Sequence, residues 1–181
     1  MKKITMAAII VVLSLCLNAQ QAISPNTSNL NGIKWVNMTE ALSKSGPTKK
    51  KILIDFFTDW CGWCKVMDAK TYTNPTVIEL MNKYYLPVKF NAEKEDPIKY
   101  RGKDYALGGD GRNTHTLAIQ LLDGQMGYPT TTFMDSEHIR ITNLPGYIDA
   151  AEMILLLKFY GENKHLKMEY QQYKMEQASK R

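Results

Sequence analysis

The feature that most constrains the fold of this chain is a strand-like apolar run placed directly before a pair of cysteines. Residues 51–57, KILIDFF, are almost continuously apolar and of strand length, which is typical of a strand buried on both faces of a sheet. Cys61 and Cys64 follow, separated by only two residues, and residues 64–72 are helix-forming. The sequence therefore predicts that both cysteines lie where a buried strand gives way to the first turn of a helix.

Strand and helix patterns alternate along the chain. Asn37 and Glu40 form a capping-box pattern before a short helix that Gly46 and Pro47 are expected to end. We expect helices over about 38–44, 64–72, 76–84, 114–122 and from 150 onward, and strands over 51–57, 85–93, 130–134 and 139–144. A strand, a helical segment and a second strand in this order favour a crossover unit. The pattern is that of an α/β fold with a helix-covered sheet.

One stretch between the second and third of these strands has a weaker pattern. Residues 98–107, IKYRGKDYAL, suggest a small hairpin that turns at Arg101 and Gly102. Residues 108–113, GGDGRN, are expected to form a loop. This loop lacks the lysine and the hydroxyl residue of a phosphate-binding loop, so we expect no nucleotide site there.

The N-terminus has the pattern of a secretory signal peptide. A lysine-containing start precedes an apolar run over residues 6–17, and small and polar residues follow. The run is shorter than the ~20 apolar residues that a membrane-spanning helix needs. We expect residues 1–20 to be removed and the protein to be exported to the periplasm or another extracytoplasmic compartment. An uncleaved N-terminal anchor and a lipid anchor on Cys16 are the alternatives.

The rest of the chain divides into three parts. Residues 21–32 are rich in Asn, Ser, Thr, Pro and Gln, which is typical of a flexible leader. Residues 33–160 carry the strand and helix patterns of a single domain. Residues 161–181 are polar, but Tyr170 and Tyr173 stand at helical spacing. We therefore expect a helical C-terminal extension, whose tyrosines dock it onto another helix.

Charge and cysteine usage narrow the class of protein. The chain is 44% hydrophobic and 23% charged, which is ordinary for a globular protein. Loss of Lys2 and Lys3 with the signal peptide lowers the formal net charge from +5 to +3 (5 − 2), and this modest excess argues against nucleic-acid binding. Cys16 leaves with the same segment, so Cys61 and Cys64 are the cysteines of the mature chain.

Three roles are open to a cysteine pair of this spacing. A zinc site needs four ligands, whereas His115, His138 and His165 are widely separated, so we expect surface histidines and no bound metal. A structural disulfide across so short a loop removes little chain entropy. A redox role fits the expected position of the pair at a helix start, because a cysteine there faces unpaired N–H groups and the positive end of the helix dipole. Both favour the thiolate over the thiol.

The order of four motifs resembles the thioredoxin superfamily. These motifs are ILIDFFTDWCGWCK, VKFNAE, GYPTTTF and LPGYIDAAEM, and the similarity covers about residues 35–160. The run TYTNPTVIELM is further similar to exported thioredoxin-like domains, including the periplasmic domain of transmembrane disulfide reductases. The resemblance implies a thioredoxin-like three-layer sandwich, with a central mixed sheet and helices on both faces. Two departures are Trp63, where thioredoxin itself has proline, and a longer stretch before Pro129 that we interpret as an insertion at about residues 94–126.

Four residues are candidates for the catalytic chemistry. Cys61, at the helix start, is expected to attack a substrate disulfide, and Cys64 to resolve the mixed disulfide that forms; this exchange needs no cofactor. Asp55 stands inside an apolar strand, where burial should raise the pKa of its carboxyl group and suit it to exchange a proton with Cys64. The family pattern implies that Lys89 lies beside Asp55. A mutually satisfied ion pair at the sheet edge is the alternative.

Four further residues are candidates for substrate binding. The family implies a cis peptide bond between Tyr128 and Pro129, which would bring the Tyr128 backbone beside Cys61 to pair with an extended substrate strand. Trp60 and Trp63 flank Cys61 and are expected to form an exposed apolar platform for polypeptides. Packing of Trp60 on the sheet is the alternative.

We therefore predict an exported thiol:disulfide oxidoreductase that acts on cysteine pairs of other proteins. In an oxidising compartment such a protein needs a partner that supplies or removes electrons, and we expect a membrane electron-transfer protein in that role. We expect a monomer without a nucleic-acid partner. The alternative is a thioredoxin-like scaffold or binding module whose cysteines do not turn over, and rapid alkylation of Cys61 near neutral pH separates the two.

Overall fold

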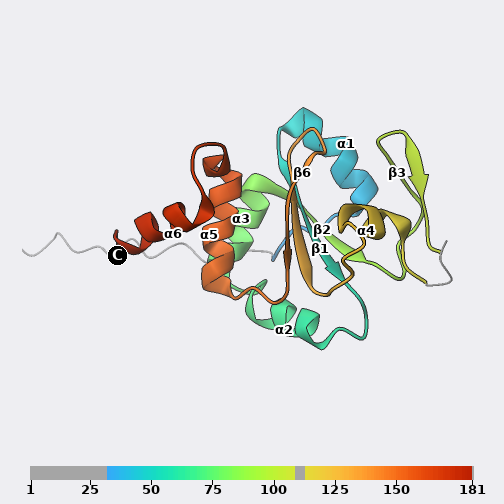
Figure 1. The fold of residues 1–181 in the computed structure, drawn as a ribbon, viewed down its shortest axis with the longest axis horizontal. Coiled ribbons are helices and arrows are strands. Elements are labelled where there is room, and N and C mark those ends of the chain that lie inside the picture. Colours follow the sequence, from blue (N-terminus) through green and yellow to red (C-terminus); the bar gives the residue numbers. More distant parts are fainter. Residues whose placement is uncertain (1–31, 109–112, 181) are drawn as a thin grey trace, which may run out of the picture.

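The structure is a computed structural model that describes residues 32–108 and 113–180 (Figure 1). The expected signal peptide, residues 1–20, lies outside the described residues, as does the expected leader apart from Gly32. Residues 109–112 of the GGDGRN loop also lie outside them. Within the described ranges, no helix has both the length and the apolar character needed to cross a membrane.

A four-stranded mixed sheet forms the centre of the fold. Its strands are β1 (Lys51–Phe57), β2 (Tyr85–Asn91), β5 (Thr130–Met134) and β6 (Arg140–Pro145), in the spatial order β2-β1-β5-β6. β1 and β2 are parallel, whereas β5 runs antiparallel to both β1 and β6. The apolar sequence of β1 explains its inner position, because residues 52–56 are all buried.

Helices cover both faces of this sheet (Figure 1). One face packs against α1 (Met38–Thr48) and α4 (Thr116–Leu121), and the other against α2 (Gly62–Lys70), α3 (Pro75–Tyr84) and α5 (Ala150–Gly161). Alternate residues of β1 supply the two cores, so that Ile52 and Ile54 belong to the first and Leu53 to the second. The predicted three-layer α/β fold with a mixed central sheet is confirmed.

The segment between β2 and β5 contains a hairpin followed by α4. β3 (Ile98–Tyr100) and β4 (Lys103–Tyr105) pair in antiparallel fashion and turn at Arg101 and Gly102, as the sequence predicted. Both turn residues have positive φ, 49° and 80°, the backbone geometry that a two-residue hairpin turn favours. The hairpin and α4 add their buried side chains to the core on the α1 side of the sheet.

Helix α1 is longer than the sequence predicted. The expected end at Gly46 and Pro47 is wrong, because the helix continues through both residues to Thr48. Proline lacks a backbone donor and usually breaks a helix interior, but here it falls in the last turn. The turn is held by tertiary contacts: Ser45 is fully buried, and its hydroxyl hydrogen-bonds with Nε2 of His138 at 2.7 Å. Packing has therefore outweighed the local stop signal.

The expectation of three surface histidines is wrong for His115, which is fully buried. Its Nδ1 accepts the backbone N–H of Leu117 at 3.2 Å and caps α4. Its Nε2 lies 3.2 Å from the carbonyl oxygen of Asp96, and its ring packs edge-on against Phe90. The side chain is buried because each of its nitrogens has a backbone partner. The other two histidines are partly buried.

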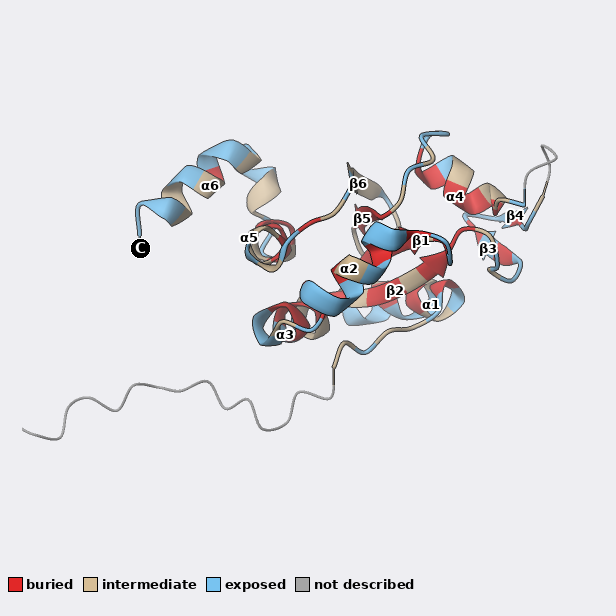
Figure 2. Ribbon diagram, turned by 90° about the horizontal axis from the view of Figure 1, so that it is seen from below, coloured by how far each residue is buried: buried red, intermediate tan, exposed pale blue. Residues whose placement is uncertain are grey.

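The C-terminal residues form a short 3-10 turn, η1 (Lys164–Leu166), and helix α6 (Tyr170–Ala178). Figure 2 shows α6 at the side of the domain, with a mixture of exposed and intermediate residues. Its buried residue is Tyr173, which packs against Phe159 of α5 with 5.3 Å between ring centroids. The Tyr170 hydroxyl also donates a hydrogen bond to Glu152 of α5 at 2.9 Å. The two tyrosines thus dock this helix onto α5, as expected.

Candidate active site

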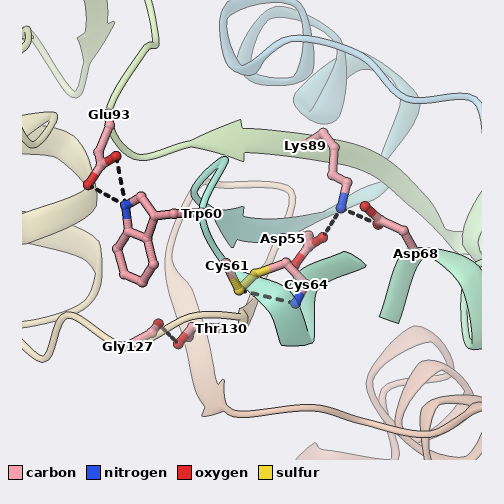
Figure 3. The surroundings of a disulfide bond; sticks show 9 residues. All are labelled: Asp55, Trp60, Cys61, Cys64, Asp68, Lys89, Glu93, Gly127 and Thr130. Carbon is pink, nitrogen blue, oxygen red and sulfur yellow. Dashed lines mark hydrogen bonds and ion pairs between the residues drawn. A yellow bond between two sulfur atoms is a disulfide. The ribbon is translucent and has the colours of Figure 1, made fainter. Parts of the chain in front are cut away.

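Both cysteines lie at the start of α2, just after the turn that follows β1 (Figure 3). Cys61 is the N-cap residue, and the backbone N–H of Cys64 donates a hydrogen bond to the Cys61 sulfur at 3.1 Å. The two sulfurs form a disulfide, and the Cα atoms are 5.3 Å apart. Both cysteines are buried in this disulfide form, and Cys61 is slightly the more exposed residue, at 5% against 2% for Cys64. The Cys61 sulfur takes the place that a side-chain oxygen occupies in other N-caps.

Two exposed tryptophans flank the first cysteine. Trp60 and Trp63 expose 68% and 63% of their surfaces, so the alternative that Trp60 packs on the sheet is wrong. The Trp60 indole N–H donates to both carboxylate oxygens of Glu93 at 3.1 Å. Its ring meets that of Tyr128 edge-on, with centroids 6.0 Å apart, and Trp63 lies 5.7 Å from Tyr147. We call these four aromatic side chains the aromatic rim.

The turn before β5 lies next to the start of α2. The peptide bond between Tyr128 and Pro129 is cis, and Pro129 is buried. The hydroxyl of Thr130 donates to the carbonyl oxygen of Gly127 at 2.7 Å and closes the turn (Figure 3). The ring contact between Tyr128 and Trp60 joins this turn to the segment that carries the cysteines.

A buried carboxylate lies beside the disulfide on the sheet side (Figure 3). Asp55 of β1 is 1% exposed and pairs in register with Lys89 of β2. The Lys89 Nζ atom lies 2.6 Å from Oδ2 of Asp55 and also contacts Oδ1 of Asp68 on α2. Asp68 is 45% exposed at its side chain. One lysine therefore bridges a buried carboxylate on the sheet and a half-exposed carboxylate on the cysteine-bearing helix.

Burial changes the acidity of Asp55. Desolvation raises the pKa of its carboxyl group from 3.8 to about 6, and the positive charge of Lys89 offsets part of this rise. The second carboxylate oxygen, Oδ1, is buried and has no hydrogen-bond partner among the described residues. A carboxyl group that titrates this close to neutral pH can both accept and release a proton under working conditions.

Most of the side chains predicted for the site lie around the start of α2, whereas Lys89 contacts Asp68 in the second half of this helix. The predicted residues are Asp55, Trp60, Cys61, Trp63, Cys64, Lys89, Tyr128 and Pro129. Three further residues were missed: Asp68, Glu93 and Tyr147. Asp68 could have been found, because it stands one helical turn after Cys64. Within residues 32–108 and 113–180, no group of three or more His, Cys, Asp or Glu side chains is placed to hold a metal ion.

A mixed sheet covered on both faces, a cysteine pair that opens a helix and a proline turn beside it define a thioredoxin-like protein. The chain belongs to the Thioredox_DsbH family, whose model, described as "Protein of unknown function, DUF255", matches residues 17–180. The resemblance to the thioredoxin superfamily that the sequence predicted is confirmed.

Comparison with individual proteins relates the chain to disulfide interchange proteins. It is 27% identical over 162 residues to the thiol:disulfide interchange protein DsbD of Vibrio vulnificus strain CMCP6; the match covers 81% of this chain and 24% of the relative. A solved DsbH oxidoreductase is similar with a TM-score of 0.53 and 20% identity, covering 77% of this chain and 90% of that one. A thioredoxin-fold protein from Helicobacter pylori is similar with a TM-score of 0.58 and 14% identity, covering 74% of this chain and 88% of that one. The two structures show the shared fold.

Proposed function

We propose that this protein is a thiol:disulfide oxidoreductase that exchanges disulfides with cysteine pairs of exported proteins through Cys61 and Cys64. The observation that carries the proposal is the N-cap position of the Cys61 sulfur, which accepts the N–H of Cys64 and faces the start of α2. Both the hydrogen bond and the helix dipole favour a thiolate at Cys61. The name of the Vibrio relative, thiol:disulfide interchange protein, supports the same chemistry.

The exchange proceeds through a mixed disulfide. The Cys61 thiolate attacks one sulfur of the substrate disulfide, a bond forms between them, and the second substrate sulfur leaves with the electron pair. Cys64 then loses its proton, and its thiolate attacks the Cys61 sulfur. The mixed disulfide breaks, the Cys61–Cys64 disulfide forms, and the substrate leaves as two thiols after taking up protons. The reverse sequence oxidises a substrate dithiol.

Asp55 is the proposed proton acceptor for Cys64. Its carboxyl group lies on the sheet side of the disulfide, and a pKa of about 6 lets it take a proton at neutral pH and return it afterwards. Lys89 limits the rise in the pKa of Asp55 and fixes one of its oxygens at 2.6 Å. The two residues therefore act together on the second step of the exchange.

The aromatic rim and the proline turn are the proposed substrate-binding surface. Trp60 and Trp63 offer exposed apolar area on either side of Cys61, which suits an unfolded or extended polypeptide. The backbone of Tyr128, ahead of Pro129, is the proposed pairing edge for such a strand, and the contact of the Tyr128 ring with Trp60 beside Cys61 supports this role. We further propose that residues 1–20 are an export signal, that a membrane electron-transfer protein is the partner, and that the mature chain acts as a monomer; the lysine-containing start and the apolar run over residues 6–17 support the export signal.

The test is an insulin reduction assay combined with trapping. Wild-type protein should reduce insulin disulfides with dithiothreitol as the electron source, whereas Cys61→Ser should have no activity above background. Cys64→Ser should accumulate a mixed disulfide with its substrate, because the attacking sulfur remains and the resolving sulfur is lost. Full activity in Cys61→Ser, or no trapped complex in Cys64→Ser, would overturn the proposal and favour a binding module.

A further inference from the structure

A row of polar side chains crosses one face of the sheet within an otherwise apolar core. Asp55 is in register with Lys89 on β2 and with Thr131 on β5, so the three side chains leave the sheet on the same side. Two positions along, Leu53 and Phe133 are fully buried on this face and belong to the apolar core. The polar row therefore lies between the disulfide and the apolar core beneath α3 and α5.

Tyr72, just beyond the end of α2, covers this row. It is 6% exposed, and Trp35 packs edge-on against its ring at 5.1 Å. The Nζ atom of Lys89 lies 5.2 Å from the centre of the same ring. The hydroxyl of Tyr72 therefore enters the polar row from the helix side, while Asp55 and Thr131 enter it from the sheet.

Three oxygen atoms in this place are buried without a hydrogen-bond partner among the described residues, so in this disulfide form none of them bonds to either of the other two. They are Oδ1 of Asp55, the hydroxyl of Tyr72 and Oγ1 of Thr131. Two of them are donors and one is an acceptor, so their chemistry is complementary. Burial raises the pKa of Tyr72 well above 10, with the charge of Asp55 adding to the rise, so this hydroxyl stays protonated. The Tyr72 hydroxyl also lowers the pKa of Asp55, as a donor to a carboxylate does.

We propose that Tyr72 is a positioning residue for the exchange reaction: in the reduced protein its hydroxyl comes within hydrogen-bond distance of Oδ1 of Asp55, donates to it together with Thr131, and holds that carboxylate ready to take the proton of Cys64. The inference rests on the proposed function. Tyr72 itself stays neutral throughout: the proton passes from the Cys64 thiol to Asp55, and the freed electron pair of Cys64 forms the bond to the Cys61 sulfur. The charged and titratable groups that face Asp55 are Lys89, Asp68, Tyr72 and the cysteine pair.

The test removes one hydroxyl and reads a pH profile. Tyr72→Phe keeps the ring and loses the donor, so the ionised form of Asp55 is less favoured. We expect the acid limb of the rate of mixed-disulfide resolution to move up by about 0.5 to 1 pH unit, so that rates on this limb fall about three- to tenfold. Thr131→Val should move the limb in the same direction.

Tyr85→Phe is the matched control. Tyr85 is also buried on this face of the sheet, but its hydroxyl donates to the carbonyl oxygen of Leu157 at 2.8 Å. Its loss should lower stability and leave the acid limb in place. An acid limb that stays in place in both Tyr72→Phe and Thr131→Val, or one that moves equally in Tyr85→Phe, would overturn the inference.

A direct measurement separates this inference from the proposed function. The carboxyl carbon of Asp55 can be titrated by NMR in the reduced protein, with and without the Tyr72 hydroxyl. A higher midpoint in Tyr72→Phe than in wild type is expected, and an equal midpoint would overturn the inference even if the variant turns over slowly. Wild-type protein without exchange activity would instead remove the proposed function, and the titration would still report whether Tyr72 donates to Asp55.

Discussion

The backbone N–H of Cys64 donates to the sulfur of Cys61 at 3.1 Å, so the helix that carries both cysteines is capped by one of them. An N-cap acceptor gains from negative charge, because it faces unpaired N–H groups and the positive end of the helix dipole. In the reduced protein the same position holds a thiol or a thiolate. The capping position therefore favours the thiolate of Cys61, so the start of the helix contributes to the reactivity of this cysteine.

The first prediction concerns the acidity of Cys61. In the reduced protein its pKa should lie below the ordinary ~8.5, and Cys61 should be alkylated faster than Cys64 at pH 7. The pH dependence of iodoacetamide modification, with each cysteine followed by mass spectrometry, measures both. Cys64→Ser is the control, because it keeps the backbone N–H that caps with Cys61. A Cys61 pKa at or above ~8.5 would contradict the proposed role of the cap.

The second prediction concerns the aromatic rim. Trp60→Ala and Trp63→Ala should each raise the KM for a reduced or oxidised protein substrate about fivefold, because each removes an exposed apolar contact. Reduction of a small disulfide such as oxidised glutathione should change little. Leu166→Ala is the matched control, since Leu166 is 74% exposed on the C-terminal extension. Equal loss with protein and small substrates would argue that the tryptophans act on the sulfurs and do not bind the polypeptide.

The third prediction follows from the raised pKa of Asp55. Its pKa is about 6 in the folded protein and near 3.8 when unfolded, so the folded state binds this proton more tightly. The stability it contributes is fully present below about pH 3.8 and is lost as the pH rises through 6. Asp55→Asn should therefore be more stable than wild type at pH 8, by on the order of 2 kcal/mol. Urea denaturation at several pH values tests this, and parallel stability curves would contradict it.

The fourth prediction concerns His115. Burial lowers the pKa of its imidazole below 6.5, so the folded state binds a proton less readily than the unfolded state. The stability it contributes is present above about pH 6.5 and is lost as the pH falls through the lowered folded pKa. His115→Asn keeps a side chain that can cap α4 but does not titrate. Between pH 7.5 and 5 the variant should lose less stability than wild type, measured by urea denaturation; an unchanged slope would refute the assignment.

Asp55 and His115 act with opposite signs over overlapping pH ranges. The free energy of unfolding of the wild-type protein can therefore change little with pH while both groups titrate. The double variant Asp55→Asn/His115→Asn resolves the two contributions, and it should vary less with pH than either single variant.

Local patterns predicted the parts of the fold whose cause is local. β1 could be recognised because a strand buried on both faces has a continuous apolar sequence. The Arg101–Gly102 turn could be recognised because a turn with positive φ favours glycine. The placement of the cysteines at a helix start followed from the same strand-to-helix pattern. Asp55 could be recognised as a carboxylate inside an apolar strand, but its pairing with Lys89 came from the family resemblance, since nothing local pairs two residues on neighbouring strands.

Features that depend on tertiary packing could not be predicted. Pro47 is a local stop signal, but the helix continues past it in a turn where the buried Ser45 hydrogen-bonds with His138. His115 carries no spacing signal, and its burial depends on backbone partners that the fold supplies. The ring of Tyr72 lies beside Lys89, the ion-pair partner of Asp55, only because the fold brings the end of α2 next to β2.

Lys89 provides a single positive charge for two carboxylates, Asp55 and Asp68. With Asp55 ionised the three groups sum to one negative charge, and with Asp55 protonated they sum to zero. When the disulfide is reduced and a thiolate forms, a further negative charge lies near these groups, and this charge favours proton uptake by Asp55. Reduction of the Cys61–Cys64 disulfide would then be accompanied by uptake of a proton at Asp55. The reduction potential of this disulfide would therefore depend on pH through a residue that forms no bond to either sulfur.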